Sequence, residues 1–254
     1  MSIRLSVILH CYNNQAALVK QANIFQSWGN PPGVEVIFID DGSSPPLDVS
    51  VFPNWVKPFR ILDDIPWNQP GAKNLGASQA SGDWLFFYDA DVFLDIKNLA
   101  QLVAYLPGLQ PSVLYRFARI WVQHEKEIDS HTNCQIVHRL TYLCGGVTYD
   151  EDMSGSYGYD DTLFEKAWLF SGRNIQVLSG ITLRHDTDMP TTVLSRDTSI
   201  NGRKLQLKLN YLWVHKLTSQ FSGFSRRILA LATKLGWALP PSSKRVGFRW
   251  ERSD

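Results

Sequence analysis

Three groups of acidic residues stand where a protein could bind a cation or move a proton. Asp89-Ala90-Asp91 places two carboxylates one residue apart, and a hard divalent cation is the usual relief for their mutual repulsion. Asp40-Asp41-Gly42-Ser43 has a glycine that permits a sharp turn, so a carboxylate there could accept hydrogen bonds from a ligand. Asp160-Asp161 is a third group, in which the repulsion between two adjacent carboxylates would raise one pKa.

Each group also has an ordinary structural explanation. Asp89 could cap the turn that follows it, Asp41 could complete an Asx turn, and a helix N-terminus stabilises acidic residues such as Asp160 and Asp161. The local patterns leave both interpretations open. The elements that position the residues therefore decide between them.

The first 100 residues alternate between the patterns of buried strands and helices. Four apolar runs predict strands, at Leu5–Leu9, Val34–Ile39, Phe59–Leu62 and Trp84–Tyr88. Helices are predicted between or after them, at 15–28, 71–80 and 96–106. This alternation predicts an α/β fold with a mostly parallel sheet between helices. Ligands of such sheets bind at the carboxyl ends of the strands. We therefore expect residues 10–13, 40–43 and 89–91 to face one crevice.

The second half has weaker patterns. A helix is predicted over 161–170, and two amphipathic helical stretches are predicted over 205–217 and 224–235. Strands are predicted over 113–122, 135–143, 145–147, 176–178 and 181–183.

Charge is divided unevenly along the chain. The chain is 44% hydrophobic and 19% charged, a composition that excludes a disordered chain. Its length of 254 residues suits one large domain, or one with an appendage. Residues 202–254 hold 11 Lys and Arg against 2 Asp and Glu, whereas residues 1–201 hold 14 against 22. The basic segment could lie on a membrane, or pack against the acidic part or a second subunit. Nucleic acid is not expected as a partner, because no binding module accompanies the charge.

The sequence lacks the motifs of several other classes of protein. The cysteines Cys11, Cys134 and Cys144 are too few and too far apart for a disulfide scaffold or a zinc knot, and no Gly-x-Gly-x-x-Gly or P-loop motif is present. The run Leu5–Leu9 is too short for a signal-peptide core. We expect a cytoplasmic protein, with peripheral contact at the inner face of the membrane left open.

Four linked motifs resemble those of the family 2 glycosyltransferases, which have the GT-A fold. They are SVILHCYN at 6–13, VIFIDDGS at 36–43, PGAKNLG at 70–76 and ASGDWLFFYDAD at 80–91, and together they cover about residues 3–95. The resemblance implies a Rossmann-like catalytic domain at 1–201, with a nucleotide-binding half at about 1–95 and an acceptor half at about 96–201. A basic, amphipathic helical extension at 202–254 follows.

The resemblance implies a metal-dependent, inverting enzyme that moves a sugar from a UDP-sugar to a hydroxyl of a polysaccharide, glycan or lipid-linked saccharide. Asp161 would be the catalytic base, with Asp160 in place of the family's Glu. The ligands of Mn²⁺ or Mg²⁺ would be Asp91, Asp89 and His185. Asp41 would contact the nucleobase, and the whole set implied to bind the nucleotide-sugar is His10, Tyr12, Asn13, Asp41, Gly42, Lys73, Asn74, Asp89 and Ala90.

Two other functions are weighed against this one. The run Phe86–Asp91 also resembles the nucleophile strand of haloacid-dehalogenase-type phosphatases, but that motif expects Thr or Val where Phe93 stands and lies nearer the N-terminus. A non-catalytic nucleotide-sugar-binding protein of the same fold is the second alternative.

Overall fold

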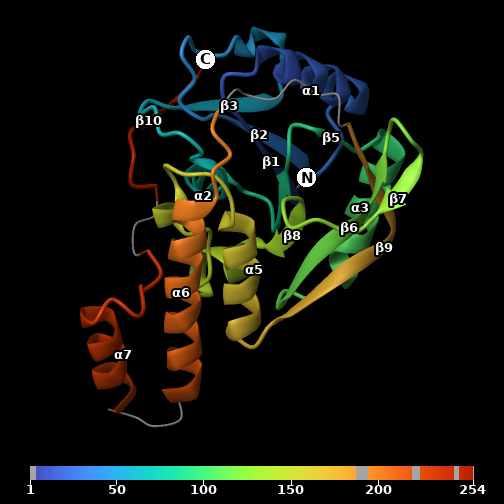
Figure 1. The fold of residues 1–254 in the computed structure, drawn as a ribbon. Coiled ribbons are helices and arrows are strands. Elements are labelled where there is room, and N and C mark those ends of the chain that lie inside the picture. Colours follow the sequence, from blue (N-terminus) through green and yellow to red (C-terminus); the bar gives the residue numbers. More distant parts are fainter. Residues whose placement is uncertain (1–3, 187–193, 219–223, 243–245, 254) are drawn as a thin grey trace.

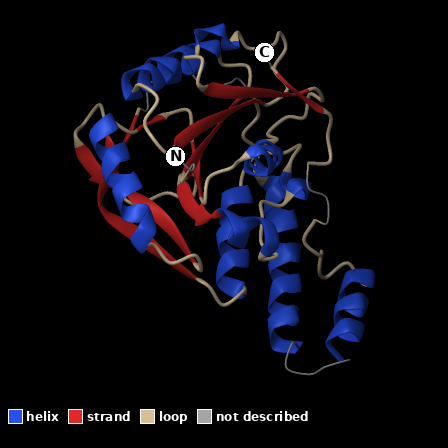
Figure 2. Ribbon diagram, turned by 180° about the vertical axis from the view of Figure 1, so that it is seen from behind, coloured by secondary structure: helices blue, strands red, loops and turns tan. Residues whose placement is uncertain are grey.

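One mixed sheet runs through the molecule, with helices on both of its faces (Figures 1 and 2). The computed structural model describes residues 4–186, 194–218, 224–242 and 246–253. In chain order the elements are β1 Leu5–Cys11, α1 Gln15–Trp28, β2 Val34–Asp40, β3 Val56–Ile61, α2 Gln69–Gln79, β4 Trp84–Tyr88, β5 Val92–Phe93, α3 Ile96–Tyr105, β6 Val113–Trp121, β7 Lys126–Ile128, β8 Gln135–His138, α4 Arg139–Cys144, α5 Asp160–Phe170, β9 Asn174–His185, α6 Ser199–Thr218, α7 Phe224–Lys234 and β10 Trp250–Arg252.

The sheet has the strand order β10-β3-β2-β1-β4-β8-β6-β9-β5, and β7 pairs with β6 at the side. Its centre, β3-β2-β1-β4, is entirely parallel, whereas β8, β5, β7 and β10 pair in the antiparallel sense. The predicted α/β class with a mostly parallel central sheet is confirmed. The carboxyl ends of β1, β2 and β4 consequently meet at one edge.

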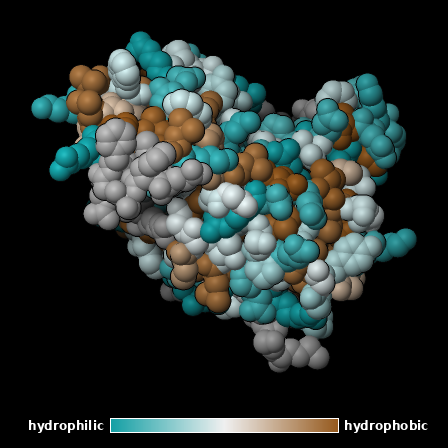
Figure 3. Space-filling view, turned by 90° about the horizontal axis from the view of Figure 1, so that it is seen from below, coloured by the Kyte–Doolittle hydropathy of each residue, from teal (hydrophilic) through white to brown (hydrophobic). Residues whose placement is uncertain are grey.

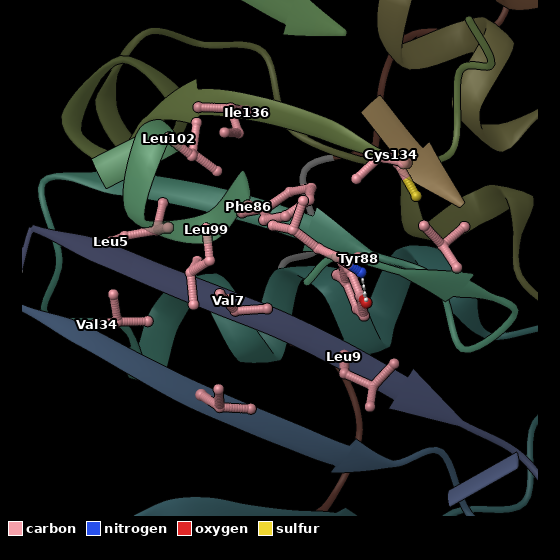
Figure 4. Packing of buried hydrophobic residues seen from close by; sticks show 14 of the residues in the cluster. Leu5, Val7, Leu9, Val34, Phe86, Tyr88, Leu99, Leu102, Cys134 and Ile136 are labelled. Atoms are coloured by element: carbon pink, nitrogen blue, oxygen red, sulfur yellow. Dashed lines mark hydrogen bonds between the residues drawn. The ribbon is translucent and has the colours of Figure 1, made fainter. Parts of the chain in front are cut away.

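Alternation along the central strands produces two separate cores. Leu5, Val7 and Leu9 of β1 face α1 and α3, together with Phe86 and Tyr88 of β4 (Figure 4). The intervening residues of the same strands face α2, α4 and α5 on the other side of the sheet; they include Ile8, Ile37, Leu85 and Phe87. Side chains of successive strand residues point to opposite faces. Continuous apolar runs therefore mark strands that are covered on both faces.

Helix α2 lies very close to β1. A Cβ atom on Gly76 would lie 2.3 Å from the Ile8 side chain, so only glycine allows this approach. The close contact sets the position of the polar residues on α2, including Lys73, over the carboxyl edge of the sheet.

The structure corrects three predictions in the second half. The strand predicted over 135–143 ends at His138 and continues as α4, and the strand predicted at 145–147 is a turn in which Gly146 has φ of +80°. The two strands predicted at 176–178 and 181–183 are one strand, β9, with a register shift opposite Phe117 and Ala118 and a left-handed Gly180. Apolar runs of three to five residues do not reveal such turns and bulges by their periodicity.

The C-terminal segment is tied into the rest of the molecule. Helix α6 packs on α5, and the proposed division at 201/202 falls within its first turn. The buried Asn201 amide donates to the carbonyls of Met153, Ser156 and Gly158, and the buried Lys208 ammonium lies 2.7 Å from Asp150 Oδ2. No helix among the described residues is long and apolar enough to cross a membrane.

A buried carboxylate joins β1 and β2 to the turn before β4. Glu35 Oε1 accepts hydrogen bonds from Ser6 Oγ at 2.6 Å and from the amides of Ser81 and Gly82, and Oε2 accepts one from Lys57 Nζ at 2.6 Å. Burial acts to raise the pKa of Glu35, but the hydrogen bonds from Lys57, Ser6 and Ser81 outweigh it and the pKa is lowered.

Glu35→Ala should lower the free energy of unfolding by about 1–3 kcal/mol near neutral pH, because it leaves buried donors without an acceptor. Since the folded-state pKa of Glu35 is depressed, its contribution is full above the ordinary pKa and is lost as the pH falls through the folded value. Urea unfolding at neutral and acidic pH would measure both effects. The control Glu127→Ala, at an exposed position of β7, should stay within about 0.5 kcal/mol of the wild type; equal losses in both variants would contradict the prediction.

Candidate functional site

The site is built around a buried ion pair between Lys73 and Asp161. Lys73, on α2, has no exposed surface, and its Nζ lies 2.8 Å from Asp161 Oδ1 at the start of α5. Tyr149 donates a hydrogen bond from its hydroxyl to the same oxygen at 2.7 Å, and Gln69 Nε2 donates to Oδ2 at 3.1 Å. The Lys73 ammonium also donates to the Tyr149 hydroxyl and lies 4.5 Å from the centre of its ring. The Asp161 carboxylate is thus fixed by three side chains.

The other carboxyl groups near Lys73 are less well compensated. Burial lowers the pKa of Lys73, but the carboxylates of Asp161, Asp89 and Asp160 outweigh burial and raise it, so Lys73 is a cation. Burial and the neighbouring Asp161 raise the pKa of Asp160 to about 7, although Lys73 opposes the shift. Burial raises the pKa of Asp89 to about 8 against the same opposition. One ammonium therefore serves several acidic groups.

Antiparallel pairing brings His185 to the acidic residues that follow β4. Val92 of β5 is paired with His185 of β9, and His185 Nδ1 lies 3.7 Å from Asp91 Oδ2. Burial raises the pKa of Asp91, and His185 acts in the opposite direction. Asn133 Nδ2 donates a hydrogen bond to Asp89 Oδ2.

These groups suit a divalent cation. Asp89 Oδ1, Asp91 Oδ1 and His185 Nδ1 are buried and have no hydrogen-bond partner among the described residues. Within those residues no cluster of three or more His, Cys, Asp and Glu side chains is arranged to hold a metal. Mg²⁺ and similar ions commonly take one or two protein carboxylates and complete their shell with phosphate oxygens and water. The residues present fit a cation that is bound together with a phosphate ligand.

Asp41 lies at the end of β2, beside the end of β1. Its amide donates to the Cys11 carbonyl at 2.9 Å, and its Oδ1 accepts a hydrogen bond from Asn68 Nδ2 at 2.9 Å. Burial raises the pKa of Asp41 well above its ordinary value. Gly42 has φ of +79°, and a Cβ there would lie 2.7 Å from the Asp63 carbonyl oxygen, so the turn requires glycine.

The remaining residues implied by the resemblance divide into two groups. His10, half-buried, is in the centre of the site: burial and then Lys73 lower its pKa to about 3, so its imidazole is neutral, and Nδ1 has no partner among the described residues. At the end of β1, Tyr12 donates to Asp64, and the Asn13 carboxamide oxygen accepts from the Ser44 amide.

The second group is occupied by contacts within the protein. Asn74 donates to the Tyr149 carbonyl and to Glu151, and it accepts a hydrogen bond from the Tyr142 hydroxyl. The Ala90 carbonyl accepts from Gln21 Nε2 at 2.8 Å. These groups support the walls of the site.

The sequence analysis did not single out Tyr149, Gln69, Asn68 or Asn133. Asn68 and Gln69 lie just before the motif at 70–76, and this proximity was an available signal. Tyr149 and Asn133 lie in segments whose composition carries no comparable signal, and only the tertiary structure brings them to Asp161 and Asp89.

The family model described as glycosyl transferase family 2 matches residues 6–230. The chain belongs to this family. It is a glycosyltransferase that uses a nucleotide-sugar, and membership sets aside the phosphatase alternative. No curated protein sequence matches the chain.

Solved structures of S. aureus TarS share the GT-A fold of this family 2 member. TarS 1-349 in complex with UDP-GlcNAc is 16% identical with a TM-score of 0.62, over 92% of this chain and 77% of that one. TarS 1-349 in complex with UDP is 17% identical with a TM-score of 0.54, over 92% of this chain and 76% of that one. A longer TarS structure is 16% identical with a TM-score of 0.56, over 91% of this chain and 53% of that one.

Lys73→Met should lower the free energy of unfolding by about 3–5 kcal/mol at about pH 8, because it leaves the partly buried Asp161 carboxylate without its cation. The loss should be smaller at about pH 5: the folded variant binds protons more tightly than the unfolded chain, so its stability falls as the pH rises. Urea unfolding of variant and wild type at both pH values would measure the difference. Lys73→Arg, which keeps the charge, and Lys97→Met, at an exposed site of α3, are the controls. A loss for Lys73→Met that does not depend on pH would contradict the prediction.

Proposed function

We propose that this family 2 glycosyltransferase moves a sugar from a UDP-sugar to a hydroxyl group, depends on Mn²⁺ or Mg²⁺, and inverts the anomeric centre. The observation that carries the proposal is the position of Lys73, whose ammonium pairs with Asp161 at 2.8 Å and also acts on Asp89 and Asp160. Groups suited to a diphosphate and groups suited to deprotonating an acceptor are therefore in electrostatic contact.

The donor side is proposed to extend from Asp41 to Asp91. Asp41 and Asn68 form a buried polar pair next to the end of β1, which suits the hydrogen-bonding groups of uracil. His10, Tyr12, Asn13 and Gly42 are proposed to line the same end of the crevice. The UDP-GlcNAc and UDP complexes of TarS support UDP as the nucleotide, at the level of a shared fold.

Asp91, Asp89 and His185 would hold the cation, in the manner of a DxD motif completed by a histidine. A divalent cation, when bound, supplies positive charge against the diphosphate leaving group. Lys73 adds a second, permanent positive charge within the protein. Its burial strengthens this charge's effect, because electrostatic interactions are less screened away from water.

The acceptor side is proposed to use Asp161 as the general base, with Asp160 beside it. Tyr149 and Gln69 orient the Asp161 carboxylate, which takes the proton of the acceptor hydroxyl as that oxygen attacks the sugar. The adjacent carboxyl groups of Asp160 and Asp161 suit single displacement with inversion, which needs a base and no covalent intermediate. The acceptor is proposed to be a saccharide of polysaccharide or glycan biosynthesis, free or lipid-linked. The expected cytoplasmic location stays a prediction.

UDP in the presence of Mn²⁺ should raise the melting temperature of the wild type, and Asp91→Asn should abolish the metal-dependent part. At a UDP concentration of about 100 Kd the stabilisation would be about 2.7 kcal/mol. Thermal unfolding with UDP, Mn²⁺, Mg²⁺ and EDTA would measure it. Asp129→Asn, at an exposed carboxylate after β7, should keep the full shift. Equal shifts for both variants would remove Asp91 from the proposed site.

Asp161→Asn should reduce the hydrolysis of the preferred UDP-sugar at least about 100-fold while leaving the UDP-dependent melting shift intact. A panel of nucleotide-sugars identifies the donor, since slow attack by water requires no knowledge of the acceptor. A non-catalytic binding protein would show the melting shift and no hydrolysis in the wild type.

The wild-type rate should rise with pH through about 7, because ionisation of Asp160, whose pKa is raised to about 7, adds a negative charge beside the proposed base Asp161 and favours proton transfer to it. Asp160→Asn should remove this inflection from the pH profile of kcat. Asp83→Asn, at an exposed position, should leave the inflection in place. An unchanged inflection in Asp160→Asn would assign the titration to another group.

A further inference from the structure

The C-terminal segment carries positive charge without any acidic residue over a long stretch. From residue 198 to residue 250 there is no Asp or Glu, and ten Lys and Arg residues lie in that interval. The buried Lys208 pairs with Asp150 and Asp152, and Arg249 pairs with Asp63 at 2.7 Å. Carboxylates of residues 1–201 therefore neutralise these two cations. Others lie on α6 and α7, which project from the body of the molecule at its lower end in Figure 1.

Helix α7 has apolar residues on two sides, one that packs against α6 and one that is exposed. Ile228, Leu229 and Ala232 lie on its inner side, where Leu229 is buried and α7 packs against α6. On the outer side, exposed leucines alternate with exposed cations at helical spacing; the series is Arg227, Leu231, Lys234 and Leu235. Leu231 and Leu235 are each more than half exposed, at 57% and 56%. No contact among the described residues covers the apolar side chains of Leu231 and Leu235.

More exposed apolar side chains lie on α6 and just after α7. Trp237, just after α7, is 70% exposed, yet its backbone is fixed because its carbonyl accepts a hydrogen bond from Asn210 of α6. Trp213 and Leu217 of α6 are also more than half exposed, and with Phe170 and Lys216 they line a hollow of about 350 Å³. Figure 3 looks onto this end and shows hydrophobic residues standing among hydrophilic ones.

We propose that this α6–α7 surface, defined by Arg227, Leu231, Lys234, Leu235, Trp237, Trp213 and Leu217, docks on the surface of an anionic lipid bilayer. Tryptophan and leucine insert at the boundary of headgroups and acyl chains, while neighbouring lysine and arginine contact anionic headgroups. Membrane binding of this kind needs no spanning helix. The inference goes beyond the proposed function, since it does not depend on sugar transfer.

Charge favours the membrane over a second copy of the chain. Two α6–α7 surfaces brought together would face each other with cations and no acidic residue from 198 to 250 to pair them. An acidic nucleic acid would satisfy the cations but not the exposed leucines. An anionic bilayer complements both the charge and the apolar side chains.

Binding of the full chain to large vesicles tests the proposal by co-sedimentation. We expect binding to phosphatidylcholine vesicles with about one third phosphatidylglycerol, little binding to phosphatidylcholine alone, and release at high salt. Arg227→Gln/Lys234→Gln should weaken binding about 30-fold, since each cation near the surface contributes about one kilocalorie per mole. Leu231→Glu/Leu235→Glu should weaken it at least about tenfold.

Matched controls separate this surface from the rest of the molecule. Leu140→Glu/Val177→Glu places two charges at other exposed apolar positions, and Lys97→Gln/Lys126→Gln removes two exposed cations elsewhere; both should bind like the wild type. All substituted residues are exposed, so folding is retained, and the UDP-dependent melting shift checks this separately. Equal losses in test and control variants would overturn the proposal. So would a dimer in solution that Leu231→Glu/Leu235→Glu dissociates, in the absence of vesicle binding.

Discussion

The buried ammonium group of Lys73 is the interaction on which the site depends. It lies among the carboxyl groups of Asp161, Asp160 and Asp89, and its positive charge opposes the rise that burial causes in the pKa values of Asp160 and Asp89. Asp161 receives the direct ion pair, and the other two keep raised pKa values. In the proposed function, the charge of a bound diphosphate or cation would change the protonation of this group of carboxyls. Lys73 would thereby link donor binding to the basicity of the acceptor side.

The fold brings these groups together by two different means. Parallel strands β1, β2 and β4 end at the same edge of the sheet, and the residues after each strand meet there without further adjustment. His185 arrives differently: β9 runs antiparallel to β5 and ends opposite Val92, next to Asp91. The close approach of Gly76 to Ile8 then sets α2, and with it Lys73, over this edge.

The C-terminal segment supports the site from outside the sheet. Asn201 binds three carbonyl groups of the loop that precedes α5, and Lys208 binds Asp150 and Asp152 in the same region. The turn that presents Asp160 and Asp161 is therefore held by α6. Other surfaces of α6 and α7 carry exposed apolar and cationic side chains, so one segment joins the turn before Asp160 and Asp161 to the proposed bilayer surface.

By itself, the sequence determined the central architecture and the edge at which the acidic groups gather. Strands β1, β2 and β4 are apolar on both faces, a pattern that is local and unambiguous, and Asp41, Asp89 and Asp91 follow them directly. The sequence could not show that residues 139–144 form a helix, because the short apolar run there fits a strand equally well. It did not reveal Tyr149 or Asn133 as partners of the acidic residues. The Lys73–Asp161 pair joins residues that are 88 positions apart in the sequence. The burial of Lys73 and the raised pKa values of Lys73 and Asp160 exist only when α2, α4 and α5 pack on one face of the sheet. Ionisation depends on the dielectric surroundings and the distances between charges, and only the tertiary structure determines these.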